Sequence, residues 1–132
     1  MNQTSIAIAI TVAFFSGLDS IAKAAERTKA TYKSADKARI ALIPAFAKHG
    51  QLKNAVSRDD DGNVTGWNQP NKRRDVKKQA NKLNYLLRLA FAPKGRDKGN
   101  SKFDAAASAK AFVSKHTAGQ TKRYIAELRA LV

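Results

Sequence analysis

Apolar residues recur every three or four positions through residues 5–31, a spacing that places them on one face of an α-helix. Other apolar residues widen that face near the N-terminus, so we expect the first turns to be buried on most sides. Gly17 interrupts the pattern at a cost of about 1 kcal/mol relative to alanine, which a long helix tolerates. The β-branched residues of segment 6–12 leave a strand as the alternative there. The predicted helix carries on its main face Ile6, Ile10, Phe14, Leu18, Ile21 and Ala25.

A second helix is expected after residue 34. Ser34 can cap it, because a serine side chain accepts a hydrogen bond from a free backbone N–H of the first turn. The inward-facing residues at helical spacing are Ala38, Leu42 and Phe46. Pro44 lacks an N–H and clashes with the preceding turn, so it either kinks this helix or begins a new turn. The pair His49-Gly50 predicts the end of the helix, with the glycine in the left-handed conformation.

Residues 52–67 change from a helical to a strand-like pattern. Two short β-compatible runs flank an Asp-Gly pair, which is a strong signal for a β-hairpin. If Asp61 and Gly62 are the two central residues of the turn, Val56 lies opposite Trp67. A hairpin this small is marginal unless it packs on the helices.

A third amphipathic helix is predicted over residues 72–91, with Asn71 as its cap and Pro93 beyond its end. One face carries Val76, Ala80, Leu83, Leu87 and Ala90. The last two turns are apolar nearly all round, so we expect them to be buried. The first half then presents its basic side chains to solvent.

Two further helices follow a basic connection over residues 94–101 that contains no apolar residue. Ser101 or Asp104 caps the fourth helix, which runs to about His116. A capping box that opens at Thr117 starts the fifth helix, because its threonine and glutamine can satisfy free backbone N–H groups.

These elements predict a mainly α fold, a compact single-domain bundle of four to five helices with a short β-hairpin near residues 55–67. The chain has 132 residues, of which 43% are apolar, enough for one modest core. We expect residues 1–132 to form one helical domain. Within it, residues 1–50 build the core and residues 67–132 form a basic half that faces a partner.

Positive charge is concentrated in that second half. The formal net charge is +15, and residues 72–102 carry eleven Lys or Arg against two Asp, a net of +9 in 31 residues. Crowded like charges destabilise a compact fold by repulsion, and a polyanionic partner relieves that repulsion. The pattern favours nucleic acid, bound through its phosphates.

Phosphate binding requires positive charge gathered on one surface, and a helix N-terminus adds its dipole and free N–H groups. We expect contacts from the third helix, a clamp from the loop after it and an extension from the last helix. Trp67 and Tyr85 offer rings on which bases of a single strand can stack, although the pattern favours Trp67 as an anchor of the hairpin. The predicted contact residues are Lys72, Arg73, Arg74, Lys77, Lys78, Lys82, Lys94, Arg96, Lys98, Lys122 and Arg123.

The sequence therefore predicts a non-enzymatic accessory protein that binds DNA or RNA through the phosphate backbone with weak sequence specificity. One alternative is a basic effector or inhibitor, of viral type, that docks on an acidic surface of a host protein. Another is a virion or assembly component whose charge balances a packaged genome. A chain without cysteine suits a reducing compartment, so we expect a cytoplasmic or nucleoid-associated protein.

Membrane association is not expected. The apolar run 6–15 is shorter than the roughly 20 residues that span a bilayer. It also lacks the basic segment that precedes the apolar part of a signal peptide.

Residues 103–131 have the outline of a helix-turn-helix, in which the second helix enters the major groove by its N-terminal residues. Those residues are 120–123, and their Gln and Arg side chains can pair with base edges. Gln120 stands where a small apolar residue usually fills the turn. An ordinary pair of packed helices is therefore the alternative.

The loop that contains Asp59–Asp61 resembles an EF-hand only in part, because Ser57 stands at position 1 and Asn68 replaces the bidentate Glu of position 12. Three consecutive carboxylates cannot all converge on one metal pair, so we expect a charged turn and no metal or cofactor. The sequence contains no phosphate-binding glycine loop, nucleophile elbow or zinc-ligand spacing. His49 and His116, each near a predicted helix end, are expected to be cap residues. The sequence predicts no enzyme.

Overall fold

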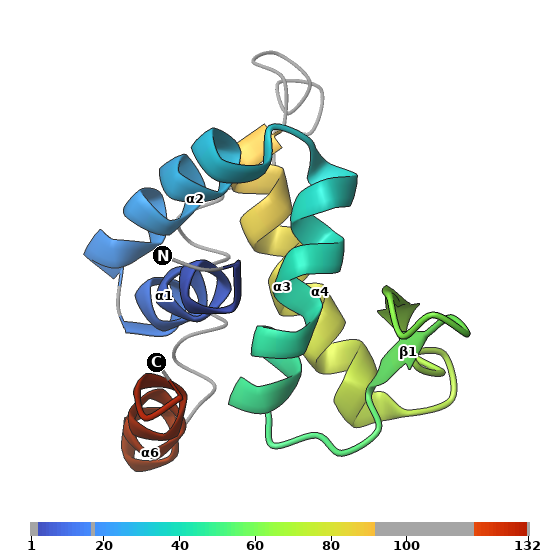
Figure 1. Cartoon of the computed structure of the whole chain (residues 1–132). Coiled ribbons are helices and arrows are strands. Elements are labelled where there is room, and N and C mark those ends of the chain that lie inside the picture. Colours follow the sequence, from blue (N-terminus) through green and yellow to red (C-terminus); the bar gives the residue numbers. More distant parts are fainter. Residues whose placement is uncertain (1–2, 17, 92–117, 132) are drawn as a thin grey trace, which may run out of the picture.

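A computed structural model of the chain describes residues 3–16, 18–91 and 118–131. These residues form five α-helices and one two-stranded antiparallel sheet (Figure 1). The elements are α1 (Gln3–Ser16), α2 (Leu18–Tyr32), α3 (Ala35–His49), β1 (Val56–Arg58), β2 (Val64–Trp67), α4 (Arg74–Phe91) and α6 (Ala118–Arg129). The prediction of a mainly helical bundle with a small hairpin is confirmed. The predicted fourth helix and the connection before it lie outside the described residues.

The apolar N-terminal segment forms two helices, so the prediction of one long helix was wrong. α1 ends at Ser16 and α2 begins at Leu18. A single helix over residues 5–31 is about 40 Å long, too long for both halves to reach one small core. As two helices, α1 and α2 pack against each other, and α1 also contacts α3 and α6. Figure 1 shows α1 nearly end-on between α2 and α6, which explains how a helix apolar on most sides is covered.

The core joins all five described helices in one cluster. The rings of Phe14 and Phe15 in α1 and Phe46 in α3 lie with their centroids 4.9–5.6 Å apart, in tilted and edge-on geometries that aromatic pairs favour. Leu83 of α4 and Leu128 of α6 are fully buried against the same cluster. This core fixes the orientation of α4, whose opposite side faces solvent.

α3 begins as predicted, because the Ser34 side chain accepts a hydrogen bond of 3.2 Å from the backbone N–H three residues on. Pro44 lies inside the helix and does not begin a new turn. The prediction for the helix end was wrong in one respect: Gly50 has φ −78°, and Gln51 takes the left-handed conformation at φ 58°. Crowding explains why residue 50 is a glycine, since a Cβ added at this position would lie 3.1 Å from Cδ of Gln79.

The hairpin pairs Val56 with Trp67, as predicted, but its turn is one residue longer than expected. The N–H of Gly62 donates to the carbonyl of Asp59 at 3.0 Å, and Gly62 has φ 84°. This is the three-residue loop that combines a tight turn with a left-handed glycine. Thr65 is the extra residue of β2, a bulge that restores the predicted pairing further along.

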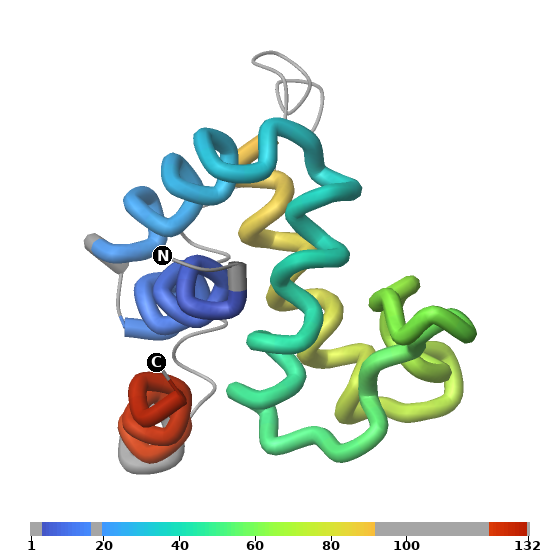
Figure 2. Tube along the Cα trace, viewed as in Figure 1, coloured from blue at the N-terminus to red at the C-terminus, as the bar shows by residue number. Residues whose placement is uncertain are grey.

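The hairpin is held to the helices by a second, smaller cluster. Ala47 of α3, Ala55 before β1 and Val76 of α4 are buried together, with Trp67 packed against them. Trp67 is half-buried and also contacts the main core. Figure 2 shows the hairpin beside α3 and the start of α4, at one side of the helices. Trp67 is therefore an anchor of the hairpin, which makes so short a sheet stable.

Across the described residues, no helix combines the length and the apolar character that crossing a bilayer requires. α1, which is strongly apolar, has 14 residues, fewer than the roughly 20 of a typical span. Its apolar side chains are used in the core instead.

Candidate nucleic-acid interface

α4 has two faces with opposite chemistry, because a period of 3.6 residues separates its apolar and polar positions. The inner face packs on α2 and α3. Its buried residues are Val76, Gln79, Lys82, Leu83, Leu86, Leu87 and Ala90. On the opposite side is a polar surface, which we call the outer face of α4. It comprises exposed Arg74, Lys77, Lys78, Asn81, Asn84 and Arg88 with half-buried Tyr85.

The outer face of α4 carries four cations and no carboxylate. The helix has one acidic residue, Asp75, which lies about 100° round the axis from Arg74. Arg74, Lys77 and Lys78 form no salt bridge with any described residue. Like charges one turn apart destabilise a helix by a few tenths of a kcal/mol per pair. An anionic partner on this face would remove that repulsion.

Arg73, a predicted phosphate contact, is committed to the protein's own backbone. Its guanidinium donates to the carbonyls of Lys53 and Asn54 at 3.2–3.3 Å and lies 3.5 Å from a carboxylate oxygen of Asp75. Asn54 has φ 58°, so these bonds hold a left-handed turn just before the hairpin. Arg73 therefore fastens the hairpin to the start of α4, and we leave it out of the proposed interface.

Lys82, also a predicted contact, belongs to the inner face. It is 7% exposed, and its Nζ lies 5.9 Å from the ring centroid of Phe15. Its position explains this, because it follows buried Gln79 by three residues and precedes buried Leu86 by four. Arg88, which the prediction omitted, takes its place on the outer face. The helical spacing of each cation from the buried residues of α4 distinguishes Lys82, on the inner face, from Arg88, on the outer face.

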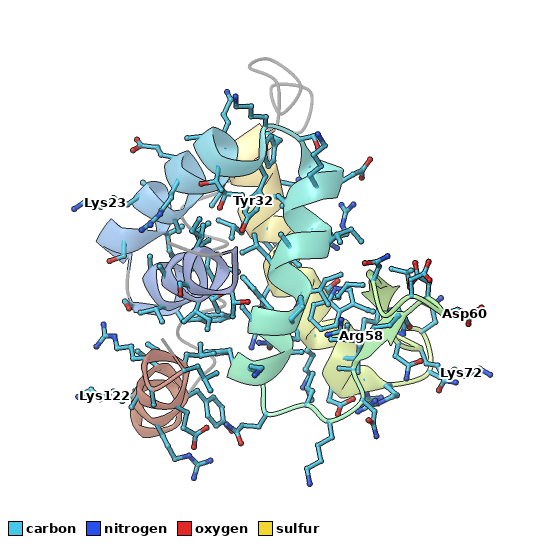
Figure 3. All side chains as sticks on the ribbon, viewed as in Figure 1. Lys23, Tyr32, Arg58, Asp60, Lys72 and Lys122 are labelled. Carbon is cyan, nitrogen blue, oxygen red and sulfur yellow. The ribbon has the colours of Figure 1, made fainter. Side chains whose placement is uncertain are left out.

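The remaining predicted contacts that the structure describes come from two separate segments of the chain. Lys72 is exposed just before α4, whereas Lys122 and Arg123 are exposed on α6. Figure 3 shows Lys72 and Lys122 projecting from opposite sides of the molecule. An extension of the footprint from α4 to Lys122 and Arg123 stays a prediction. The predicted loop contacts Lys94, Arg96 and Lys98 lie outside the described residues.

The first helix of the predicted helix-turn-helix lies outside the described residues as well. Its second helix, α6, packs on α1 and α3 and buries Leu128. The guanidinium of Arg123 lies 5.2 Å from the ring centroid of Tyr124, a cation–π contact on its own helix. Base reading by this helix stays a prediction.

His49, predicted to be a cap residue, is the last residue of α3, and the cap itself is Gly50. His49 is fully buried, and its ring stacks on Phe15 with centroids 3.5 Å apart and planes 8° from parallel. The side-chain amide of Gln79 lies 3.1 Å from Nδ1 of His49 and donates to the carbonyl of Phe46 at 2.8 Å. Sequence reasoning missed Gln79, which links the inner face of α4 to the end of α3.

The acidic turn at Asp59–Asp61 is held by hydrogen bonds between a side chain of the turn and the backbone. One carboxylate oxygen of Asp59 accepts hydrogen bonds from the N–H groups of Asp61 and Asn63, at 3.0 and 2.9 Å. Such a turn stabilises the hairpin tip. Within the described ranges, no group of three or more His, Cys, Asp or Glu side chains is placed to hold a metal ion.

Comparisons with protein-family models, with curated proteins and with solved structures each found no match. Function therefore has to be inferred from the residues of this chain. Among the described residues, the outer face of α4 offers the clearest chemistry, a row of exposed cations on a rigid element.

Proposed function

We propose that this protein binds nucleic acid without catalysing a reaction, and that it holds the phosphate backbone on the outer face of α4. The observation that supports the proposal is a helix surface with four exposed cations and no carboxylate. α4 has 18 residues, a length of about 27 Å. Duplex DNA carries one phosphate charge per about 1.7 Å of axis, so a helix this long meets many phosphates.

The proposed contacts are direct charge–phosphate pairs. Arg74 and Arg88 lie 14 residues apart, about 21 Å along the helix axis. The major groove is about 12 Å wide, so cations at both ends of α4 can reach the phosphates on its two sides. Asn81 and Asn84 lie between them and can donate to phosphates or to base edges. The phosphate-contact set is Lys72, Arg74, Lys77, Lys78 and Arg88.

Because most of these contacts are to phosphates, we expect weak sequence specificity and a steep dependence on salt. Five neutralised phosphates correspond to a slope of log K against log[salt] of about −4.5 on duplex DNA. Such a protein would work beside nucleic acid in the cytoplasm or on the nucleoid. A viral accessory or assembly role is one setting in which a small protein with this chemistry is used.

The proposal is tested by titrating the protein into labelled random-sequence DNA and RNA at several salt concentrations and recording fluorescence anisotropy. The key variant is the triple charge reversal Arg74→Glu, Lys77→Glu and Lys78→Glu. A matched control, Lys29→Glu, Lys37→Glu and Lys48→Glu, changes the net charge equally at other exposed positions. We expect the outer-face variant to lose at least tenfold more affinity than the control, with both melting temperatures near that of the wild type.

Equal losses in the two variants would contradict the assignment of the outer face. No binding to either nucleic acid at low salt would contradict the function itself. In that case, retention of an acidic protein from a nuclease-treated extract would favour the alternative, a basic effector that docks on an acidic surface.

A further inference from the structure

The outer face of α4 is exposed along nearly the whole helix, from Arg74 to Arg88. At 3.6 residues per turn, its positions cover about 120° of the helix circumference, and the buried positions cover about 140° on the other side. A helix with its side chains is about 10–12 Å across. The major groove of B-DNA is about 12 Å wide and 8.5 Å deep. A helix exposed in this way has the dimensions to enter that groove.

Asn81 occupies the middle of the outer face, and two cations lie on either side of it. Lys77 is four residues before Asn81, about 40° to one side around the axis, and Lys78 is three residues before it, about 60° to the other side. When a helix lies in the major groove, the middle of its exposed face meets the base edges. The two flanks meet phosphates of the opposite strands, so this arrangement matches amides to bases and cations to phosphates.

The side chains of Asn81 and Asn84 have no structural partner that explains them. Both are exposed, and neither forms a hydrogen bond with a described residue. By contrast, the amide of Gln79 on the inner face donates to the carbonyl of Phe46 at 2.8 Å. Asparagine is also one of the weaker helix formers, so these two residues do not strengthen α4. An asparagine amide offers the donor and the acceptor that adenine pairs with in the major groove.

Other nucleic acids fit this face less well than duplex DNA. Single strands bind largely by stacking their bases on exposed rings. Every aromatic residue in the part of the chain that the structure describes is buried or half-buried. The major groove of an RNA duplex is deep and narrow, so side chains do not reach its base edges. Duplex DNA is therefore the class of partner that the face favours.

The acidic turn of the hairpin restricts where on α4 a duplex can lie. The hairpin lies beside the start of α4 (Figure 2), and its exposed carboxylates at Asp59–Asp61 repel phosphate there. Asn81 is seven residues beyond Arg74, about 10 Å further along the helix axis. The middle of α4 is therefore better placed than its first turn to sit deepest in the groove.

We propose that α4 enters the major groove of duplex DNA and that Asn81, with Asn84 one turn further on, pairs with adenine. This inference rests on the proposed function, because the same face carries the phosphate contacts. The amide N–H of Asn81 donates to N7 of the base, and its amide oxygen accepts from the N6 amino group. One or two such pairs add a modest preference for A·T base pairs to binding that is mainly electrostatic.

The inference is tested with short labelled duplexes of equal length, by fluorescence anisotropy at physiological salt. One duplex has an A·T centre, one has a G·C centre, and a third repeats the A·T centre with 7-deazaadenine, which lacks the N7 acceptor. An RNA duplex and a DNA single strand complete the set. The key variant is Asn81→Ala. Its matched control, Asn63→Ala, removes an exposed amide from the hairpin turn.

We expect the wild type and the control to bind the A·T duplex at least about fivefold more tightly than the G·C or the 7-deazaadenine duplex. The RNA duplex and the single strand should bind more weakly than any of these. Asn81→Ala should lose the A·T preference, while its affinity for the G·C duplex stays within about twofold of the wild type because the phosphate contacts are unchanged. Its melting temperature should equal or exceed that of the wild type, since alanine is the better helix former.

The outcomes separate this inference from the proposed function. A wild type without an A·T preference, or a preference that survives Asn81→Ala or 7-deazaadenine, overturns the role of Asn81. Binding of the RNA duplex or the single strand as tightly as duplex DNA overturns the major-groove placement. In each of these cases salt-dependent binding persists and the proposed function stands. A wild type that binds none of the probes at low salt overturns the proposed function as well.

Discussion

Lys78 and Lys82 are one helical turn apart in α4, yet they belong to different parts of the molecule. Lys78 is exposed on the outer face, among Arg74, Lys77 and Arg88. Lys82 is 7% exposed, and its ammonium group lies over the ring of Phe15 in the core. Two lysines that look equivalent in the sequence therefore have different surroundings: Lys78 is exposed to solvent and Lys82 is packed in the interior.

The contrast shows why counting charges along a chain does not give the charge of a surface. The inner face of α4 is constrained by packing, so changes there alter the free energy of unfolding. The outer face is exposed mainly to solvent, so changes there alter stability little.

The inner face should be the most sensitive to truncation. Leu83 is fully buried in the main core, so Leu83→Ala removes apolar contacts and leaves a cavity. We expect the free energy of unfolding, measured by urea denaturation, to fall by about 3 kcal/mol. Asn84→Ala, at the next and exposed position, should change it by less than about 0.5 kcal/mol. Similar losses in the two variants would contradict the division into inner and outer faces.

The contact between Gly50 and Gln79 should be the next most sensitive feature. A Cβ at residue 50 crowds Cδ of Gln79 at 3.1 Å, although φ −78° suits alanine. We expect Gly50→Ala to cost about 1 kcal/mol in the wild type. In a Gln79→Ala background the crowding is gone, and the same change should be neutral or slightly stabilising. A double-mutant cycle by urea denaturation measures this coupling, and additive effects would rule out the contact.

Alanine substitutions of Lys78 and Lys82 compare the outer and inner faces of α4 directly. Lys82→Ala removes a buried aliphatic stem, so we expect the free energy of unfolding to fall by about 1 kcal/mol. Lys78→Ala removes a solvated side chain and should change that free energy by less than about 0.5 kcal/mol. Thermal and urea unfolding of the two variants side by side provide the measurement. A larger loss for Lys78→Ala would reverse our assignment of the faces.

Replacing Tyr32 should have the smallest effect on stability at neutral pH and a clear effect at alkaline pH. It packs in the same core as the inner face of α4, and burial raises the pKa of its hydroxyl, against a smaller lowering by Arg27. Its oxygen has no hydrogen-bond partner among the described residues. Because the folded-state pKa is raised above the unfolded-state value of about 10, the stability it provides is complete below that pH.

That stability is lost as pH rises through the folded-state pKa. We therefore expect wild-type and Tyr32→Phe melting temperatures to be similar at pH 7, because phenylalanine removes only an unpaired hydroxyl. Above pH 10 the wild type should lose stability faster than the variant. Parallel pH profiles of the two proteins would show that ionisation of Tyr32 is not linked to unfolding.

Local signals in the sequence predicted the framework well. Ser34 caps α3, and Val56 lies opposite Trp67, because capping and hairpin pairing depend on residues near one another in the chain. The turn between the strands was predicted one residue too short. Asp-Gly is compatible with several turn types, and the left-handed Gly62 with the bulge at Thr65 was the solution adopted.

Features that depend on distant residues were not predicted. The division between α1 and α2 falls between Ser16 and Leu18, where the sequence alone favoured a continuous helix, and both helices pack in the shared core. Gly50 is small because Gln79, 29 positions away, approaches it. In the candidate site, Arg74, Lys77 and Lys78 were predicted from the sequence, and Arg88 was omitted. The hydrogen bonds of Arg73 and the burial of Lys82 needed the packed structure.

The most direct test of the central claim is the salt dependence of nucleic-acid binding by Lys78→Gln and Lys82→Gln. Each substitution removes one positive charge, so the change in net charge is the same. We expect Lys78→Gln to make the slope of log K against log[salt] on duplex DNA shallower by about 0.9, and Lys82→Gln to leave it unchanged. Equal slopes for the two variants, or a shallower slope for Lys82→Gln alone, would contradict this expectation.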